Sequence, residues 1–184
     1  MNDSIGATFS VEIRDPDHRV VGSAQYKSES FVKNFMLLMQ AAFTDKNVVV
    51  KKQNGTDLST KGFSAAPTSY DTTDRGIVVG GGTAPVTAED YALENEFQTD
   101  VVRYSPILIS QPTAPVESGG VISNLMFLRS FTNVSNANIV INEIGIKVFS
   151  GGNGILIVRD VISPGIELPQ GYTVTISYQF RTVL

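Results

Sequence analysis

The residues of this sequence that are best suited to catalysis or cation binding are carboxylates in close pairs. Carboxylate groups can transfer protons or hold a cation. The pairs are Asp15 with Asp17, Asp71 with Asp74, and Glu89 with Asp90. The middle pair could bind Ca²⁺ together with Tyr70 and backbone carbonyls, but its spacing matches no EF-hand loop. Because Asp favours turns through hydrogen bonds to its own backbone, we interpret these residues as solvated turn residues.

Nucleophilic catalysis has little support in the sequence. His18 is the only histidine, and it follows the turn residues Asp15-Pro16-Asp17. A Ser-His-Asp system would depend on this one residue, so an exposed hairpin histidine is the better interpretation. The chain has no cysteine, which excludes disulfides, thiolate catalysis and cysteine-based zinc sites. We therefore predict no catalytic residues, no metal site and no cofactor.

A glycine run follows the apolar residues 77–79, as in some phosphate-binding loops. The run is Gly80-Gly81-Gly82-Thr83, with Pro85 close behind it. It lacks the Gly-x-Gly-x-x-Gly spacing of a dinucleotide fold and the Gly-Lys-Ser/Thr of a P-loop. We predict a tight turn or bulge that needs positive φ.

Two adjacent charges interrupt an otherwise apolar segment at residues 155–162. Arg159 and Asp160 would lie on opposite faces of a strand there, which is unusual for charged residues. One interpretation is a cross-strand ion pair, for example between Arg159 and Glu143. The alternative is that Arg159, Asp160 and Glu143 contact a neighbouring subunit.

The elements that position these residues are mostly β-strands. In residues 172–180 the apolar residues share one parity and Thr173, Thr175, Ser177 and Gln179 share the other, which indicates a sheet with one buried face. Asn54-Gly55 predicts a hairpin turn, and mixed parity predicts a bulge near Asn142-Glu143 or burial on both faces. We expect strands at 8–14, 18–27, 48–57, 77–79, 101–110, 121–131, 138–148, 154–162 and 172–181, with connections at 133–136, 150–154 and 164–171.

One helix is predicted at about 31–43, with Ser28 or Ser30 as its N-cap. Its apolar residues form two stripes, one of Phe31, Phe35, Leu38 and Ala42 and one of Val32, Met36, Met39 and Phe43. This is broader than the apolar face of a typical surface helix. Burial against a sheet explains it, or else Met36, Met39 and Phe43 meet a partner subunit. A second, short helix from Thr87 to Leu93 is predicted from a capping-box variant at Thr87 and Asp90.

Length and composition favour a single β-sandwich domain over residues 1–184, of jelly-roll or immunoglobulin-like type, with the helix beside it. Segments 58–76 and 111–120 are predicted as long loops. The net charge is −4, so we expect no nucleic-acid partner. No apolar run is long enough to span a bilayer and no signal peptide is visible, so we expect no membrane partner.

Several phrases of the chain resemble one group of proteins. They are Gly76-Ile-Val-Val-Gly80, Asp90-Tyr-Ala-Leu93, Arg129-Ser-Phe-Thr-Asn133, Ile141-Asn-Glu-Ile-Gly-Ile146, Leu156-Ile-Val-Arg-Asp160 and Pro169-Gln-Gly-Tyr-Thr-Val-Thr-Ile-Ser-Tyr178. In these phrases the chain resembles small virion structural proteins of tailed bacteriophages over most of residues 28–182. The resemblance implies a non-enzymatic component of the virion, on the capsid, neck or tail. It implies other virion proteins and further copies of the chain as partners, and it carries over no functional residues.

The leading hypothesis is therefore a virion structural protein that assembles through protein–protein contacts. A carbohydrate- or receptor-binding module is the alternative, with Tyr70, Tyr91 and Tyr104 as candidate sugar-contacting aromatics. An enzyme is the least supported class, because acid–base and nucleophile constellations are scarce.

Overall fold

The computed structural model describes residues 4–28, 30–65, 69–110, 116–117 and 120–183, and the chain is mainly β with one helix among them. The helix is α1 (Lys33–Thr44). The strands are β1 (Ser4–Arg14), β2 (Val20–Ser28), β3 (Val48–Lys51), β4 (Asp57–Thr60), β5 (Gly76–Gly80), β6 (Val102–Tyr104), β7 (Leu108–Ile109), β8 (Val116–Glu117), β9 (Gly120–Asn133), β10 (Ile139–Ser150), β11 (Asn153–Leu168) and β12 (Thr173–Val183).

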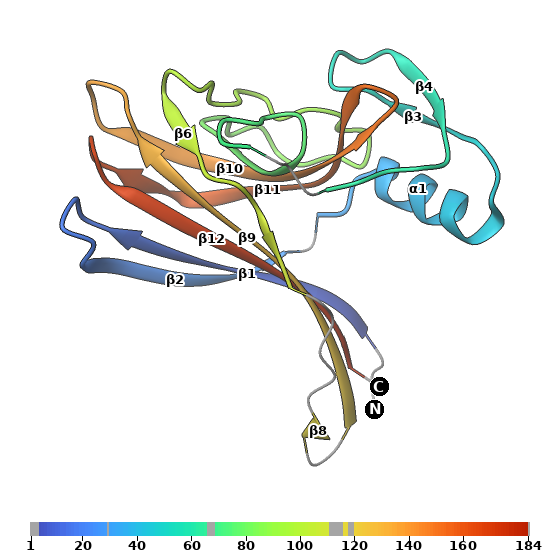
Figure 1. Cartoon of the computed structure of the whole chain (residues 1–184), viewed down its shortest axis with the longest axis horizontal. Helices are drawn as coiled ribbons and strands as arrows, with labels where there is room; N and C mark the ends of the chain where they lie inside the picture. The colour runs from blue at the N-terminus through green and yellow to red at the C-terminus, as the bar shows by residue number, and fades with distance from the viewer. Residues whose placement is uncertain (1–3, 29, 66–68, 111–115, 118–119, 184) are drawn as a thin grey trace.

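Two antiparallel sheets lie against each other in a sandwich-like arrangement (Figure 1). The large sheet has the strand order β2-β1-β12-β9-β6, and β7 and β8 also pair with β9. The small sheet has the order β11-β10-β5, and β3 and β4 form a separate hairpin. The predicted antiparallel, mainly β fold is confirmed, while its jelly-roll or immunoglobulin-like type stays a prediction.

The core forms where the apolar faces of the two sheets pack against each other. In β12, Val174, Ile176 and Tyr178 are fully buried, as their alternation predicts. On the neighbouring strand β1, Phe9 and Val11 face the same side and are also buried, and the Phe9 ring stacks on Tyr178 with centroids 4.9 Å apart. Burial of this continuous apolar face is what holds the two sheets together.

The small sheet is buried on both of its faces. In β10 every residue from Glu143 to Val148 is buried. The register with β11 shifts at the predicted bulge, because Ile141 pairs with Ile166 whereas Glu143 already pairs with Val161. The predicted turn at Pro164-Gly165 is therefore wrong: this pair belongs to the extra residues that β11 inserts opposite Asn142.

Helix α1 begins two residues later than predicted and has a different cap. Residues 30–32 run as an extended segment along β11, since Phe31 bridges Val158 and the Arg159 N–H donates to the Ser30 carbonyl. The N-cap is therefore Val32, which makes no side-chain capping bond, and the prediction of Ser28 or Ser30 is wrong. The buried face of the helix consists of Asn34, Leu38 and Ala41, which follows neither predicted stripe.

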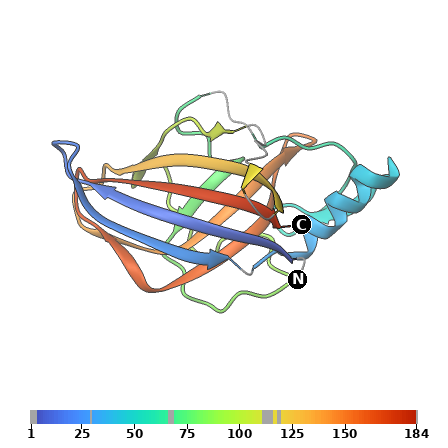
Figure 2. The ribbon, with the colours of Figure 1, turned by 90° about the horizontal axis from the view of Figure 1, so that it is seen from below.

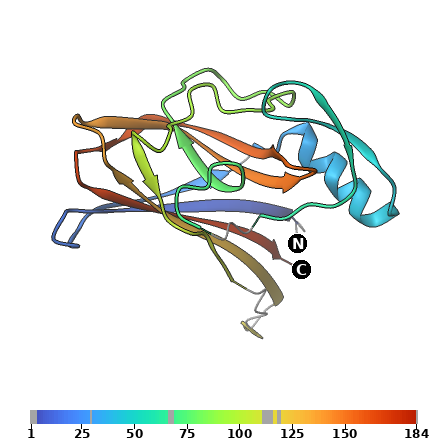
Figure 3. The ribbon, with the colours of Figure 1, turned by 45° about the horizontal axis from the view of Figure 1, so that its top comes forward.

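The hairpin of β3 and β4 forms as predicted, with Gly55 at φ +79° in its turn. The predicted loop 58–76 is shorter, because β4 continues to Thr60 and β5 begins at Gly76. The predicted loop 111–120 lies largely outside the described residues. No helix forms at 87–93, where the predicted short helix is wrong. Instead an irregular segment, residues 81–97, crosses the outer face of the small sheet (Figure 3).

Candidate functional site

The predicted cross-strand ion pair is present on the outer face of the small sheet. Arg159 of β11 is 3% exposed and Glu143 of β10 is 0% exposed, and Arg159 Nε donates to Glu143 Oε2 at 3.0 Å. Because Arg159 pairs in register with Gly145, the two charged side chains are diagonal neighbours on one face. A Cβ atom at Gly145 would lie 2.9 Å from the side chains of Leu156 and Leu93, so the glycine lets these two residues pack beside the ion pair.

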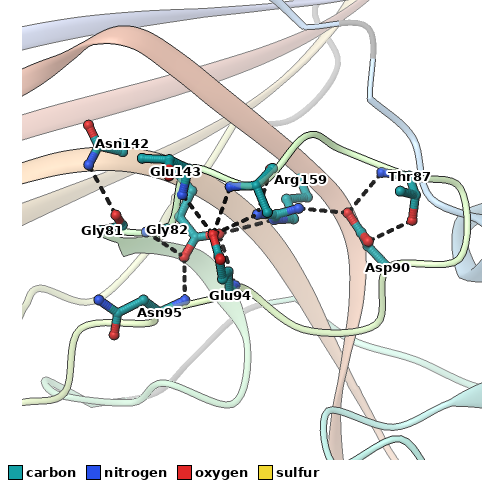
Figure 4. A network of polar contacts seen from close by, with 11 residues as sticks. Gly81, Gly82, Thr87, Asp90, Glu94, Asn95, Asn142, Glu143 and Arg159 are labelled. Atoms are coloured by element: carbon teal, nitrogen blue, oxygen red, sulfur yellow. Dashed lines mark hydrogen bonds and ion pairs between the residues drawn. The ribbon is translucent and has the colours of Figure 1, made fainter.

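Glu143 is the centre of a wider network that holds the irregular segment 81–97 in place (Figure 4). Its Oε1 accepts the backbone N–H groups of Gly82 at 3.1 Å and Asn95 at 2.7 Å, and its Oε2 accepts that of Glu94 at 3.0 Å. Hydrogen bonds to a carboxylate are charge-assisted and about twice as strong as those between neutral groups. One buried side chain therefore satisfies three backbone donors that lie outside every helix and strand.

The glycine run exists to admit this carboxylate, and its prediction as a turn with positive φ is wrong. None of Gly80, Gly81 and Gly82 has a positive φ. A Cβ atom at Gly80 would lie 2.5 Å from the Asn95 carbonyl oxygen, and one at Gly82 would lie 2.6 Å from Glu143 Oε1. The missing side chains thus allow the backbone to approach the carboxylate directly.

The second branch of the arginine fork reaches the middle of the covering segment. Arg159 Nη1 donates to Asp90 Oδ2 at 2.8 Å, and Nη2 donates to the Ala84 carbonyl at 3.2 Å. Asp90 is fixed in turn by Thr87, whose backbone N–H and hydroxyl both donate to its carboxylate. The sequence therefore predicted the Thr87–Asp90 hydrogen bonds, but they close a turn rather than begin a helix.

The electrostatics of the network favour the ionised forms of Asp90 and Arg159. Partial burial alone would raise the pKa of Asp90, but the hydrogen bonds from Thr87 and Arg159 outweigh it and hold that pKa below its ordinary value. Burial lowers the pKa of Arg159, yet Asp90 and Glu143 together raise it above the usual value. The backbone N–H groups of Ala84 and Thr83 lower the pKa of Glu94.

Asp160 performs the equivalent task on the inner face of the same strand. Its Oδ2 accepts the hydroxyl of Tyr178, from β12, at 2.5 Å and that of Ser28, from β2, at 2.8 Å. Burial and the neighbouring Asp160 carboxylate both raise the pKa of the Tyr178 hydroxyl well above its ordinary value. The adjacent charges Arg159 and Asp160 therefore tie β11 to two different layers of the same chain.

A buried arginine and a buried ion pair were missed in the sequence. Arg129 of β9 is fully buried and donates to the carbonyl oxygens of Ser105, Arg75, Ile77 and Thr72. Burial lowers its pKa to about 10. The available signal is parity: Arg129 lies between Phe127 and Phe131 on the buried side of β9.

The ion pair joins Lys147 of β10 to Glu96 of segment 81–97. Lys147 Nζ donates to Glu96 Oε2 at 2.5 Å and to the Thr73 carbonyl at 3.2 Å. Burial raises the pKa of Glu96 and lowers that of Lys147, so each charge depends on the other. Nothing in the spacing of residues 96 and 147 signals this pair, because an irregular segment brings them together.

The exposed apolar surface of helix α1 belongs to the predicted interface set. Met36 is 65% exposed and Phe43 is 82% exposed, while Met39 is half-buried. The opposite face is fixed by Asn34, whose side-chain amide donates to the carbonyls of Lys51 and Leu156 and accepts the Lys51 N–H. The structure thus separates the six predicted interface residues into an exposed helical group and the buried charges Arg159, Asp160 and Glu143.

The tyrosines do not form one platform, although one of them borders a pocket. Tyr104 is fully buried, so it cannot contact a sugar, whereas Tyr70 is exposed. Tyr91 is 41% exposed and borders a pocket of about 380 Å³ that Glu89, Asp90, Glu94 and Arg159 also line.

The remaining candidate ligands are engaged within the chain. Asp71 Oδ1 accepts the Tyr104 N–H, and Asp74 pairs with Arg75. Across the described residues, no group of three or more His, Cys, Asp or Glu side chains could hold a metal ion. His18 is exposed in the β1–β2 turn at φ 65°.

Comparisons with known proteins leave the site to be judged on its geometry. No protein-family model matches the chain, no curated protein matches it, and no solved structure matches it. In the part of the chain that the structure describes, no helix is both long and apolar enough to cross a membrane.

Proposed function

We propose that this protein is a non-enzymatic structural component of a tailed-bacteriophage virion that acts by assembling with other copies and other virion proteins. The single observation that carries the proposal is the exposed apolar group on helix α1, above all Phe43 at 82% exposed and Met36 at 65%. Large apolar side chains that stay in water on an ordered helix are typical of protein–protein contact sites. The phage context comes from the resemblance of the sequence phrases, and it leaves capsid and tail as alternative locations.

The buried charges support the same proposal. Arg159, Glu143 and Asp90 bond to one another and to backbone groups, so each is engaged in holding segment 81–97 on the small sheet. A catalytic acid or base needs a proton that can leave or arrive, and a nucleophile needs an open approach. A role in rigidity suits these residues better, because a particle component must keep its shape under load.

The test is the mass of the protein by light scattering, alone and mixed with purified particle components. The substitutions Met36→Ser and Phe43→Ser are expected to lower the mass of any assembly while circular dichroism and thermal unfolding stay unchanged. Gln40→Ser is the matched control, since Gln40 is an exposed polar residue of the same helix. A wild-type protein that stays monomeric and binds no capsid or tail component would contradict the proposal.

A carbohydrate- or receptor-binding module is the second candidate, and the pocket beside Tyr91 favours it. An exposed aromatic ring next to Glu89, Asp90 and Glu94 provides both a stacking surface and hydrogen-bond acceptors for hydroxyl groups. On this alternative, Tyr91→Ala abolishes binding on a glycan array and Tyr70→Ala leaves the binding at this pocket unchanged. An array without signal for the wild-type protein eliminates this candidate.

A further inference from the structure

Strand β2 is an edge strand of the large sheet. It pairs with β1 along one side, and no other described strand pairs with its outer side (Figure 2). Natural edge strands are usually protected by charges, proline or a bulge. The register with β1 shifts between Ile13 and Arg14, which leaves Val21 as a bulge at the start of β2. Residues 22–26 beyond this bulge, Gly-Ser-Ala-Gln-Tyr, pair regularly with β1 and carry neither charge nor proline. This edge is therefore open to pairing with a further strand.

A slot runs beneath this edge between the two sheets. The residues of β2 that face inward include Gly22 and Ala24, which pair with Ile13 and Val11 of β1. Their small size leaves a pocket of about 340 Å³, which Pro164, Gly165, Ile166 and Glu167 of β11 close from the other sheet. A strand added beside β2 would direct alternate side chains into this slot.

We propose that the strand added is β2 of a second copy, paired antiparallel about a two-fold axis at Ala24. Opposite residues of an antiparallel pair lie on the same face, and their numbers then add up to 48. Gly22 of one copy lies opposite Tyr26 of the other, and Ser23 lies opposite Gln25, so the pairing stays within the regular part of β2. The inference rests on the proposed self-association but names a surface distinct from helix α1.

The self-complementary register is the reason to choose a second copy over another partner. Tyr26 is half-buried on the inner face of β2, where its ring stacks on Phe9 with centroids 4.9 Å apart. In the proposed register the Tyr26 ring of each copy lies over Gly22 of the other, where the slot has space. No pair in the register places like charges opposite each other, and aromatic side chains stabilise cross-strand pairs.

A disulfide cross-link tests the register directly, because the chain has no cysteine. Ala24→Cys places two thiols opposite each other, with Cα atoms about 4.5 to 5.5 Å apart, which permits a disulfide. Ser23→Cys is the matched control on the same strand. Its two cysteines would be offset by two residues along the strands, with Cα atoms about 8 Å apart, which is too far for a disulfide. We expect rapid oxidation of Ala24→Cys to a covalent dimer at low protein concentration, with Ser23→Cys staying monomeric on a non-reducing gel.

Charge substitutions at one cross-strand pair provide a second measurement that needs no cross-link. Ser23→Lys combined with Gln25→Lys places lysines opposite one another across the dimer, whereas Ser23→Lys combined with Gln25→Glu places opposite charges there. Light scattering over a range of concentrations should show at least about tenfold weaker dimerisation for the first double substitution and no weakening for the second. Both positions are exposed, so circular dichroism should match the wild type.

The outcomes separate this inference from the proposed function. Self-association that neither double substitution alters, with no preferential cross-linking of Ala24→Cys, overturns the β2 pairing and leaves assembly through helix α1 intact. A protein that is monomeric at every concentration and does not cross-link at Ala24→Cys overturns the β2 pairing, and it also overturns the proposed function if it binds no capsid or tail component. Equal cross-linking of Ala24→Cys and Ser23→Cys also overturns the register.

Discussion

On its inner face the small sheet presents Ile144, Ile146 and Val158 to the large sheet, whereas on its outer face it presents Glu143, Lys147 and Arg159 to segment 81–97. All six side chains are buried. The inner residues gain free energy from apolar burial, which depends little on direction. The outer residues gain it from ion pairs and hydrogen bonds, which depend strongly on geometry.

The contrast follows from what each face must hold. The large sheet satisfies its own backbone groups through strand pairing, so it needs only a complementary apolar surface. Segment 81–97 has little regular structure, and several of its backbone groups would be left unpaired under an apolar surface. Glu143 accepts hydrogen bonds from three of its N–H groups, and Arg159 donates to the Ala84 carbonyl, so the buried charges take the place of secondary structure.

The largest expected effect is that of removing the charge of Glu143. Glu143→Gln keeps the side-chain volume, but it removes the charge that faces Arg159 and turns an NH2 donor toward groups that are themselves donors, with Asp90 left as the remaining close ion partner of Arg159. Breaking a buried ion pair in this way costs about 3 to 5 kcal/mol in the free energy of unfolding. Ile146→Val, on the inner face of the same strand, should cost only about 0.5 to 1.5 kcal/mol. Chemical denaturation of both variants measures the difference.

Two companions sharpen the first experiment. Glu89→Gln removes a carboxylate that pairs with Lys33 at the surface, and it should change stability by less than about 1 kcal/mol. The double substitution Glu143→Gln with Arg159→Met should cost less than the sum of the single substitutions, because the two groups depend on each other. Equal costs for the Glu143 and Ile146 variants would remove the distinction between the faces.

A methyl group at Gly82 should have the next largest effect. The added Cβ of Gly82→Ala would lie 2.5 Å from Glu94 Cβ and 2.6 Å from Glu143 Oε1, so the segment must shift away from the sheet. Such overpacking costs about 1 to 3 kcal/mol. At Gly62 a Cβ meets no atom within 4 Å, so Gly62→Ala serves as the control in the same denaturation series.

Acid should weaken the outer face through Asp90. Its pKa is lowered in the folded protein relative to the ordinary value of 3.8, so its stabilising effect is complete above that value and is lost as the pH falls through the folded-state pKa. At neutral pH Asp90→Asn should cost about 1 kcal/mol. In urea titrations, the difference in unfolding free energy between this variant and the wild type should narrow as the pH falls below the ordinary value of 3.8. A difference that stays constant as the pH is lowered through this region would contradict the assignment.

The smallest effect on stability is expected at the exposed residues of helix α1. Met36→Ser and Phe43→Ser remove apolar surface that already contacts water. The free energy of unfolding of the monomer, measured by thermal denaturation, should therefore change by less than about 0.5 kcal/mol. Leu38→Ser, on the buried face of the same helix, should unfold the protein or nearly so. Substitutions at Phe43 that destabilise as much as those at Leu38 would show that Phe43 serves the fold.

The alternating strands of the large sheet were readable from the sequence, and so was the bulge at Asn142-Glu143. Period-two patterns such as Val174, Ile176 and Tyr178 report directly on a buried face. The ion pair of Arg159 and Glu143 was also accessible, since two charges inside apolar strands need partners. Arg129 could have been found in the same way from its position between Phe127 and Phe131.

What the sequence did not reveal depends on contacts made by irregular chain. Gly80 and Gly82 were interpreted through the backbone angles that glycine permits, whereas the structure uses their missing side chains to admit Glu143. The cap of helix α1 was misplaced because pairing of residues 30–32 with β11 overrides the local preference of serine. Neither effect has a local pattern, because the partners lie far apart in sequence.

The hydrogen bonds from Gly82, Glu94 and Asn95 to Glu143 should also slow the exchange of amide protons of segment 81–97 with solvent. These three amide protons lie against a carboxylate that is itself 0% exposed. Hydrogen exchange at such amides requires an opening that separates the segment from the sheet. A stretch of chain without helix or strand should therefore exchange as slowly as the strands beneath it, and as one cooperative unit with β10 and β11.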